Sequence, residues 1–145
     1  MSTQKLSDFP SSGHSDNKTP KQLGYFFPAE FAPHAATWLS WPHKEASWPG
    51  KIHAIYPYYV QFIKELTKSE AVKINVNDEA MKTFALQLLK KAEVDLNKVH
   101  FFFHPTNDAW CRDHGPAFLI NPAAIQKKVI VDWNYNAWGN KYPPY

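Results

Sequence analysis

Two helical patterns of apolar residues flank a short stretch in which apolar and polar residues alternate. In that stretch Val72, Ile74 and Val76 are separated by lysine and asparagine, which is the period of two expected of a half-buried β-strand. The flanking apolar residues recur at helical spacing: Ile52, Ile55, Tyr56, Tyr59, Phe62, Ile63 and Leu66 before the strand, and Met81, Phe84, Ala85, Leu88, Leu89 and Ala92 after it. A helix–strand–helix order restricts the chain to folds in which helices cover a sheet.

The remaining elements extend this alternation. Proline is tolerated in the first turn of a helix, so we predict that the regular part of the first helix begins near Pro57. Asn77 or Asp78 is the predicted N-cap of the second helix. Runs of β-branched and aromatic residues predict further strands at residues 37–41, 99–103, 117–120 and 129–133. The resulting order of strand, helix, strand, helix and three strands predicts an α/β layered domain.

Composition limits the organisation and the setting of the chain. Residues 1–22 are polar with few apolar anchors and are predicted to form a disordered tail, which leaves residues 23–145 for one domain with a buried core. The single cysteine excludes an internal disulfide. No run approaches the roughly 18 apolar residues of a membrane span. We therefore expect a cytoplasmic protein without a membrane partner.

The net charge of +3 arises from 16 basic and 13 acidic residues spread along the chain. No basic run is dense enough to predict nucleic-acid binding. A mildly basic chain also gains no overall attraction for a cationic ligand, so binding of a cation must depend on local carboxylates.

Such carboxylates occur in residues 107–116, which read Asn-Asp-Ala-Trp-Cys-Arg-Asp-His-Gly-Pro. Asp108 and Asp113 lie on either side of Trp110. A carboxylate accepts paired hydrogen bonds from a guanidinium, and an indole face adds cation–π attraction, so the segment suits a planar organic cation. From the chemistry alone, a polar turn with capping aspartates and a core tryptophan is an equally good interpretation.

Residues 110–116 resemble the Trp-x-Arg-Asp-x-Gly-Pro segment of the agmatine deiminase family, relatives of the bacterial-type peptidyl-arginine deiminases. Further segments resemble that family in the same order along the chain, and the likeness runs from about residue 24 to the end. These segments are Phe-Pro-Ala-Glu-Phe to Trp-Leu-Ser-Trp-Pro at 27–42, Trp-Pro-Gly at 48–50, Asp-Trp-Asn-Tyr-Asn-Ala-Trp-Gly at 132–139, and Lys-Tyr-Pro-Pro-Tyr at 141–145.

The resemblance implies a specific fold. Members of the family form a pentein-type propeller, a ring of five strand-strand-helix-strand units. By this likeness the chain supplies the first unit and part of the next, and residues 23–145 are an incomplete catalytic domain.

The resemblance also implies an activity, the hydrolysis of agmatine to N-carbamoylputrescine and ammonia in putrescine biosynthesis through a covalent amidino-cysteine intermediate. Asp113 corresponds to the first guanidinium-binding carboxylate, a catalytic residue, and Trp110 to the aromatic residue that lines the substrate channel. The family's nucleophilic cysteine, catalytic histidine and second aspartate belong to segments beyond Tyr145, so we expect this chain to be inactive alone. The expected partner is a small guanidino substrate, with no metal or other cofactor, and a homo-oligomer is left open.

Other interpretations of the motif are weaker. Cys111 and His114 suggest a nucleophile and base, but the family usually has another residue at the cysteine position, so we interpret Cys111 as a spectator thiol. Cys111 with His104 and His114 also suggests zinc, although their spacing matches no standard zinc site. Arg112 is interpreted as structural and is expected to pair with Asp108.

Two questions stay open at this level. Trp133 and Trp138 either line the substrate entrance or belong to the core and turns of the next repeat, and Asn140 stands where the resemblance leads us to expect a glycine after Gly139. The alternatives for function are a non-enzymatic propeller module that binds guanidino ligands or a partner chain, and a fragment of a peptidyl-arginine deiminase.

Overall fold

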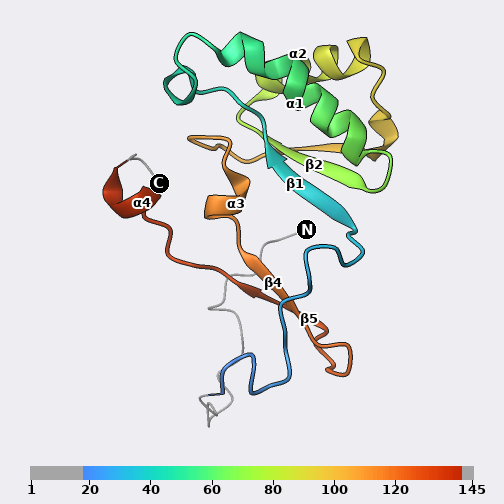
Figure 1. Ribbon diagram of the computed structural model, residues 1–145, viewed down its shortest axis with the longest axis vertical. Coiled ribbons are helices and arrows are strands. Elements are labelled where there is room, and N and C mark those ends of the chain that lie inside the picture. The colour runs from blue at the N-terminus through green and yellow to red at the C-terminus, as the bar shows by residue number, and fades with distance from the viewer. Residues whose placement is uncertain (1–17, 142–145) are drawn as a thin grey trace. The chain divides into compact units, whose positions relative to one another are not determined.

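The computed structural model describes residues 18–141, which divide into two compact units (Figure 1). The larger unit contains residues 31–115 and 132–141, and the smaller one contains residues 18–30 and 116–131. Most of the predicted tail, residues 1–17, lies outside the described residues.

The larger unit is built on a sheet of three parallel strands in the order β1 (Ala36–Ser40), β2 (Ala71–Val76) and β3 (Val99–Phe103). Parallel neighbours need a crossover connection, and here the crossovers are α1 (Ile52–Leu66) and α2 (Glu79–Lys91). Short 3₁₀ turns, η2 (Glu45–Ser47) and η3 (Leu96–Lys98), precede α1 and β3. The predicted α/β class is confirmed.

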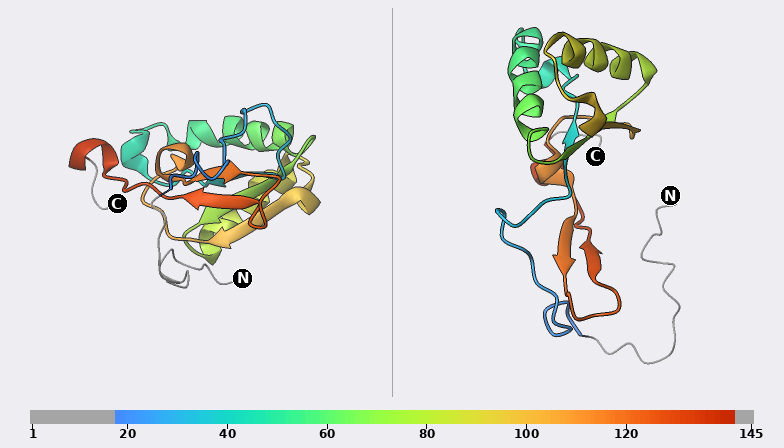
Figure 2. Two further views of the ribbon diagram at one scale, coloured as in Figure 1. Left: turned by 90° about the horizontal axis from the view of Figure 1, so that it is seen from below. Right: turned by 90° about the vertical axis from the view of Figure 1, so that its right-hand side faces the viewer.

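Both helices pack on one face of the sheet (Figure 2). Val72, Ile74 and Val76 point to this face from the central strand and are fully buried, as the alternation predicted. Burying a valine or isoleucine side chain contributes roughly 1.5–3 kcal/mol. The rest of the buried cluster consists of Trp41, Val60, Ile63, Ala85, Leu89, Val94 and Val99.

The predicted start of α2 agrees with the structure, whereas the predicted start of α1 does not. Asp78 caps α2, because its side chain accepts a hydrogen bond from the Met81 amide at 2.8 Å. The prediction that the first helix begins near Pro57 is wrong, since α1 begins at Ile52 and contains Pro57. Buried Ile52 anchors the first turn in the core. The carbonyl of His53, which Pro57 cannot bond, belongs to an exposed residue that water can reach.

The smaller unit is an antiparallel hairpin of β4 (Ala117–Ile120) and β5 (Lys128–Val131). The predicted strand at 129–133 therefore ends two residues early. Phe26 extends the hairpin by exchanging two backbone hydrogen bonds with Ile120, at 3.0 and 2.9 Å. Residues 19–24, partly in the predicted tail, form a hydrogen-bonded turn.

None of the helices within residues 18–141 is both long and apolar enough to span a membrane.

Candidate functional site

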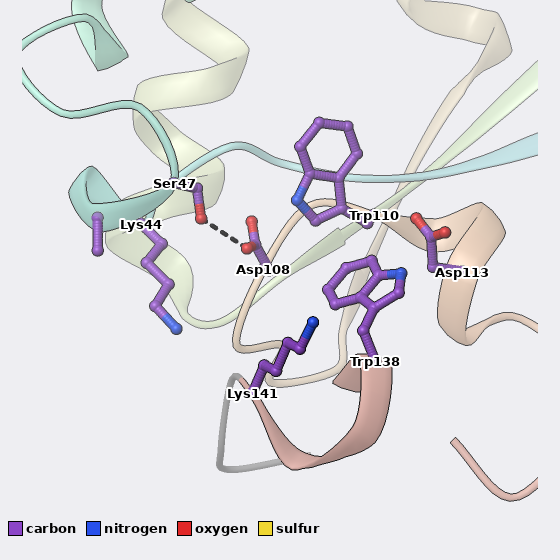
Figure 3. Close-up of a pocket in the computed structure, with 8 residues that line it drawn as sticks. Lys44, Ser47, Asp108, Trp110, Asp113, Trp138 and Lys141 are labelled. Carbon is purple, nitrogen blue, oxygen red and sulfur yellow. Dashed lines mark hydrogen bonds between the residues drawn. The ribbon is translucent and has the colours of Figure 1, made fainter. Parts of the chain in front are cut away.

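A pocket of about 700 Å³ opens in the larger unit beyond the carboxyl ends of β1 and β3 (Figure 3). Open α/β sheets bind ligands at this edge, and the volume is in the range of roughly 300–1,000 Å³ typical of small-molecule sites. The lining residues come from the segments after β1 and β3 and from the C-terminal turn: Lys44, Ala46, Ser47, Asp108, Trp110, Asp113, Trp138 and Lys141.

Both residues predicted to bind substrate, Trp110 and Asp113, line this pocket. Trp110 precedes the single-turn helix α3 (Cys111–His114), and the Asp113 amide donates to the Trp110 carbonyl at 3.0 Å. The chain then turns sharply at Gly115, where a Cβ atom would lie 2.5 Å from the Cys111 carbonyl oxygen. Glycine is therefore required for the close approach that ends α3 and fixes the position of Asp113.

The indole of Trp110 packs against that of a second tryptophan, Trp48. The indoles of Trp48 and Trp110 lie 5.7 Å apart between centroids, tilted by 32°, a geometry in which aromatic pairs attract each other. Trp110 remains 45% exposed, and Asp113 is exposed too. The pocket thus presents an indole and a carboxylate that a ligand can reach.

Asp108 has a different environment from Asp113. Its Oδ2 atom accepts a hydrogen bond from the Ser47 hydroxyl, and its Oδ1 atom accepts one from the Ala109 amide at 2.8 Å. Asp108 therefore ties the segment after β3 to η2, which fits the capping role that the sequence left open. The expected pairing of Arg112 with Asp108 stays a prediction.

Tyr135 contacts one of the lining residues, Trp138, and sequence reasoning did not single it out. Its ring packs edge-on against His114 and Trp138, with centroids 6.2 and 5.8 Å apart. The pKa of its phenol is raised above the ordinary value, first by desolvation and then by the negative charges of Asp113 and Asp108. The phenol therefore lies within the field of both carboxylates.

Asn77 joins the two segments that carry most of the pocket. Its Oδ1 atom accepts from the Thr106 amide at 2.8 Å, and its Nδ2 atom donates to the Thr106 carbonyl at 3.2 Å. The same Nδ2 group lies 3.3 Å from Nε2 of His43. Of the two cap candidates for α2, Asp78 is the cap, and Asn77 holds the segments after β1 and β3.

Cys111 is not among the lining residues. Its Sγ atom lies 3.0 Å from the hydroxyl oxygen of Ser40, at the end of β1. Burial raises the pKa of the thiol, and hydrogen bonds with Ser40 and Asn75 oppose this shift more weakly. A thiol that is protonated at neutral pH is a poor nucleophile, so the geometry favours the spectator interpretation.

Within the described part of the chain, no group of three or more His, Cys, Asp and Glu side chains is arranged to hold a metal ion. His104, one of the residues considered for zinc, instead approaches Asn75, with Nδ1 3.1 Å from the amide oxygen. Its ring stacks beside Trp38 at 6.3 Å between centroids.

Residues 26–145 match the family described as Porphyromonas-type peptidyl-arginine deiminase. The chain belongs to this family. Among curated members, a protein of Selenomonas ruminantium named "Putative agmatine deiminase" is 36% identical over 133 residues, which are 89% of this chain and 34% of the relative. A protein of the same name from Yersinia pestis is 36% identical over 121 residues, 83% of this chain and 31% of the relative. The chain spans about a third of the length of these deiminase relatives.

Solved structures of the family show the same fold over most of the chain. One of them, described as a "putative agmatine deiminase", superimposes with a TM-score of 0.71 at 30% identity. The matched region is 85% of this chain and 33% of the chain in that structure. A cysteine-to-serine variant of C. jejuni agmatine deiminase with substrate bound gives a TM-score of 0.68 at 25% identity, with 83% and 33% covered.

Proposed function

We propose that this chain forms the guanidinium-binding part of an agmatine deiminase-type hydrolase, with residues 23–145 as part of the catalytic domain. One observation carries the proposal: the carboxylate of Asp113 and the indole of Trp110 line the same pocket. Membership of a deiminase family supports it, as does the substrate found in the C. jejuni relative.

The two side chains provide complementary contacts for a guanidinium ion. The Asp113 carboxylate can accept two parallel N–H bonds along one edge of the planar cation. The Trp110 indole can cover a face of the cation, which contributes about 0.5–1 kcal/mol at an exposed site. Because Asp113 is exposed, solvent screening limits the strength of the ionic contact, and we expect weak binding by the chain alone.

In the proposed reaction a cysteine thiolate attacks the guanidinium carbon, and the bond to a terminal nitrogen breaks. A histidine supplies the proton with which this nitrogen leaves as ammonia. Water then adds to the carbon of the amidino-cysteine, the C–S bond breaks, and N-carbamoylputrescine is released. Asp113 holds the cation in position during both steps. Cys111 is partly buried against Ser40 and does not line the pocket, so we assign the nucleophile and the proton-transferring histidine to parts of the enzyme outside these residues.

The proposal extends to architecture and setting. We infer that the three-stranded parallel unit is one blade of a five-unit pentein propeller and that the β4–β5 hairpin begins the next. The TM-scores of 0.71 and 0.68 with deiminase structures support this arrangement. Agmatine hydrolysis would place the complete enzyme in putrescine biosynthesis, in the cytoplasm.

A second candidate substrate is a peptidyl-arginine, which the description of the matching family favours. Both substrates carry the guanidino group that Asp113 and Trp110 would bind, and they differ only in the remainder of the molecule. A non-enzymatic module would bind the same group without turning it over.

Titration of the 145-residue chain with agmatine, followed by NMR, tests the proposal. Replacing Asp113 by asparagine keeps the size and removes the charge, so agmatine affinity should fall about fivefold, equivalent to roughly 1 kcal/mol. Glu65→Gln is the charge-matched control, because exposed Glu65 lies on α1, does not line the pocket, and pairs with Lys68 just beyond the end of the helix. Equal affinity of the Asp113→Asn variant and the wild type would refute the proposal. A parallel titration with a peptide ending in arginine ranks the two substrates.

A further inference from the structure

Ser40 is a fully buried polar residue at the end of β1. Its register partner on β2 is Asn75. Successive side chains of a strand point to opposite faces of a sheet, so Asn75 points away from the helices, which pack over its neighbour Ile74. The single-turn helix α3 contacts β1, and its first residue, Cys111, brings Sγ to 3.0 Å from the hydroxyl oxygen of Ser40.

These side chains form a connected hydrogen-bond network. Asn75 Nδ2 donates to the Ser40 hydroxyl at 3.3 Å, and either partner of the Ser40–Cys111 pair can be the donor. The amide oxygen of Asn75 in turn lies 3.1 Å from Nδ1 of His104. The Tyr59 hydroxyl donates to the Ser40 carbonyl at 2.8 Å. Ser40 is thus held through its backbone and its side chain, so the bond with Cys111 fastens α3 to the end of the sheet.

The helical geometry of α3 connects this bond to Asp113. Successive residues of an α-helix are rotated by about 100° around its axis, so Asp113, two positions after Cys111, lies about 200° further round. Because Cys111 faces Ser40, Asp113 faces the other way and lines the pocket. Trp110 directly precedes Cys111 and is placed by the same bond. Figure 3 shows Asp113 and Trp110 together at the pocket.

We propose that Ser40 and Cys111 are positioning residues for guanidinium binding, because their hydrogen bond fixes the rotation of α3 and thereby the direction of the Asp113 carboxylate. This inference rests on the proposed function and deepens it. Cys111 acts through the backbone of α3 and does not touch the ligand, in agreement with its absence from the pocket lining. Paired N–H bonds to a carboxylate need a defined direction, so a loosened α3 should lose affinity although Asp113 keeps its charge.

The test measures agmatine affinity by NMR titration of the 145-residue chain, under conditions in which each variant is folded. Cys111→Ala and Ser40→Ala each remove the hydrogen bond, whereas Cys111→Ser keeps a hydrogen-bonding group. Thr67→Val is the matched control. Thr67 is also a buried polar residue, its hydroxyl donates to the Lys64 carbonyl at 2.9 Å at the end of α1, and it does not line the pocket.

We expect Cys111→Ala and Ser40→Ala each to weaken agmatine binding about two- to threefold. The double variant should lose no more than either single variant, because all three lack the same bond. Cys111→Ser should bind more tightly than Cys111→Ala. Thr67→Val should lower the unfolding free energy and leave agmatine affinity unchanged, which separates positioning from general stability.

A measurement on the wild type does not depend on the folding of any of these variants. If an anchored α3 favours agmatine binding, bound agmatine must favour the anchored α3 to the same extent. Saturating agmatine should therefore slow the alkylation of Cys111 by iodoacetamide about two- to threefold. It should not do so in Asp113→Asn at the same agmatine concentration, where less of the protein is occupied.

Wild-type agmatine affinity in both alanine variants, with affinity still lost in Asp113→Asn, would overturn the positioning role and leave the proposed function standing. Losses that multiply in the double variant, an equal loss in Cys111→Ser and Cys111→Ala, or a similar loss in Thr67→Val would also overturn it. So would an alkylation rate that agmatine does not change. Absence of Asp113-dependent agmatine binding in the wild type would overturn both the positioning role and the proposed function.

Discussion

The side chain of Asn77 pairs with the backbone of Thr106 in both directions, as acceptor at 2.8 Å and donor at 3.2 Å. This pair fixes the orientation of the amide, so Nδ2 must be the group that donates to Nε2 of His43. The other ring nitrogen of His43, Nδ1, then carries the proton and donates to the Trp41 carbonyl at 3.0 Å. One asparagine at the end of β2 therefore joins the segments after β1 and β3.

Replacing Asn77 by alanine should destabilise the chain and loosen the segment after β3. The change leaves the partly buried Thr106 amide without its acceptor, which costs about 1–3 kcal/mol of unfolding free energy. Denaturant unfolding and hydrogen exchange at the Thr106 amide measure the two effects. Asn97→Ala, at an exposed site in η3, is the control. An unchanged exchange rate at Thr106 would show that Asn77 is dispensable there.

The protonation site of the His43 ring provides a second test of the role of Asn77. In the wild type, ¹⁵N NMR of the neutral His43 ring should show the proton on Nδ1. In Asn77→Ala, Nε2 loses its donor while Nδ1 still donates to the Trp41 carbonyl, so the preference for the Nδ1 tautomer should weaken without disappearing. A wild-type tautomer on Nε2 would contradict the assigned hydrogen-bond directions.

The role of Asn77 also shows what sequence patterns can predict. The β2 alternation and a cap at Asn77 or Asp78 depend on neighbours within a few residues, and both were predicted. The link from Asn77 to Thr106 spans 29 residues, and no local pattern encodes it. The same limit explains why Tyr135 was missed and why the position of Trp138 was left open, because their surroundings are set by tertiary packing.

The two motif aspartates should respond differently to neutralisation. Asp108→Asn should lower the unfolding free energy by about 1 kcal/mol, because the amide cannot accept from both Ser47 and Ala109 as the carboxylate does. Its effect on agmatine affinity should be smaller than that of Asp113→Asn. Unfolding curves and agmatine titrations of both variants provide the comparison, and a reversed order would exchange the roles assigned to the two residues.

Cys111 should react slowly with iodoacetamide at pH 7 in the folded chain and much faster in denaturant. Burial raises the thiol pKa in the folded state, and only the thiolate reacts. Equal rates in the folded and denatured chain would show that the thiol is accessible and ionises normally.

The raised pKa of Cys111 also predicts how stability depends on pH. The folded state holds the thiol proton more tightly, so this stabilisation is complete below the unfolded pKa of about 8.5. It is lost as the pH rises through the folded pKa. As the pH rises above about 8.5, Cys111→Ala should therefore lose stability less steeply than the wild type. If the unfolding free energies of the two proteins depended on pH in the same way, the raised pKa assigned to Cys111 would be wrong.

The isolated chain should self-associate through the outer face of α1. Tyr58 and Phe62 lie one helical turn apart and are 79% and 47% exposed, and neighbouring exposed apolar side chains favour association. Sedimentation velocity at increasing concentration should detect larger species, which Tyr58→Ser with Phe62→Ser should reduce. Gln61→Ser on the same helix is the control. A concentration-independent monomer would indicate a self-contained domain.

The 145-residue chain should not hydrolyse agmatine. Cys111 is the only cysteine in these residues, it lies against Ser40 rather than in the pocket, and burial keeps its thiol protonated. Without a thiolate beside the guanidinium carbon, the covalent route is closed even when Asp113 holds the cation. Assays for ammonia and N-carbamoylputrescine should match the rate without protein, and Cys111→Ala should give the same result. Turnover by the wild type that disappears in Cys111→Ala would instead identify Cys111 as the nucleophile, and the assignment of that role to another part of the enzyme would have to be abandoned.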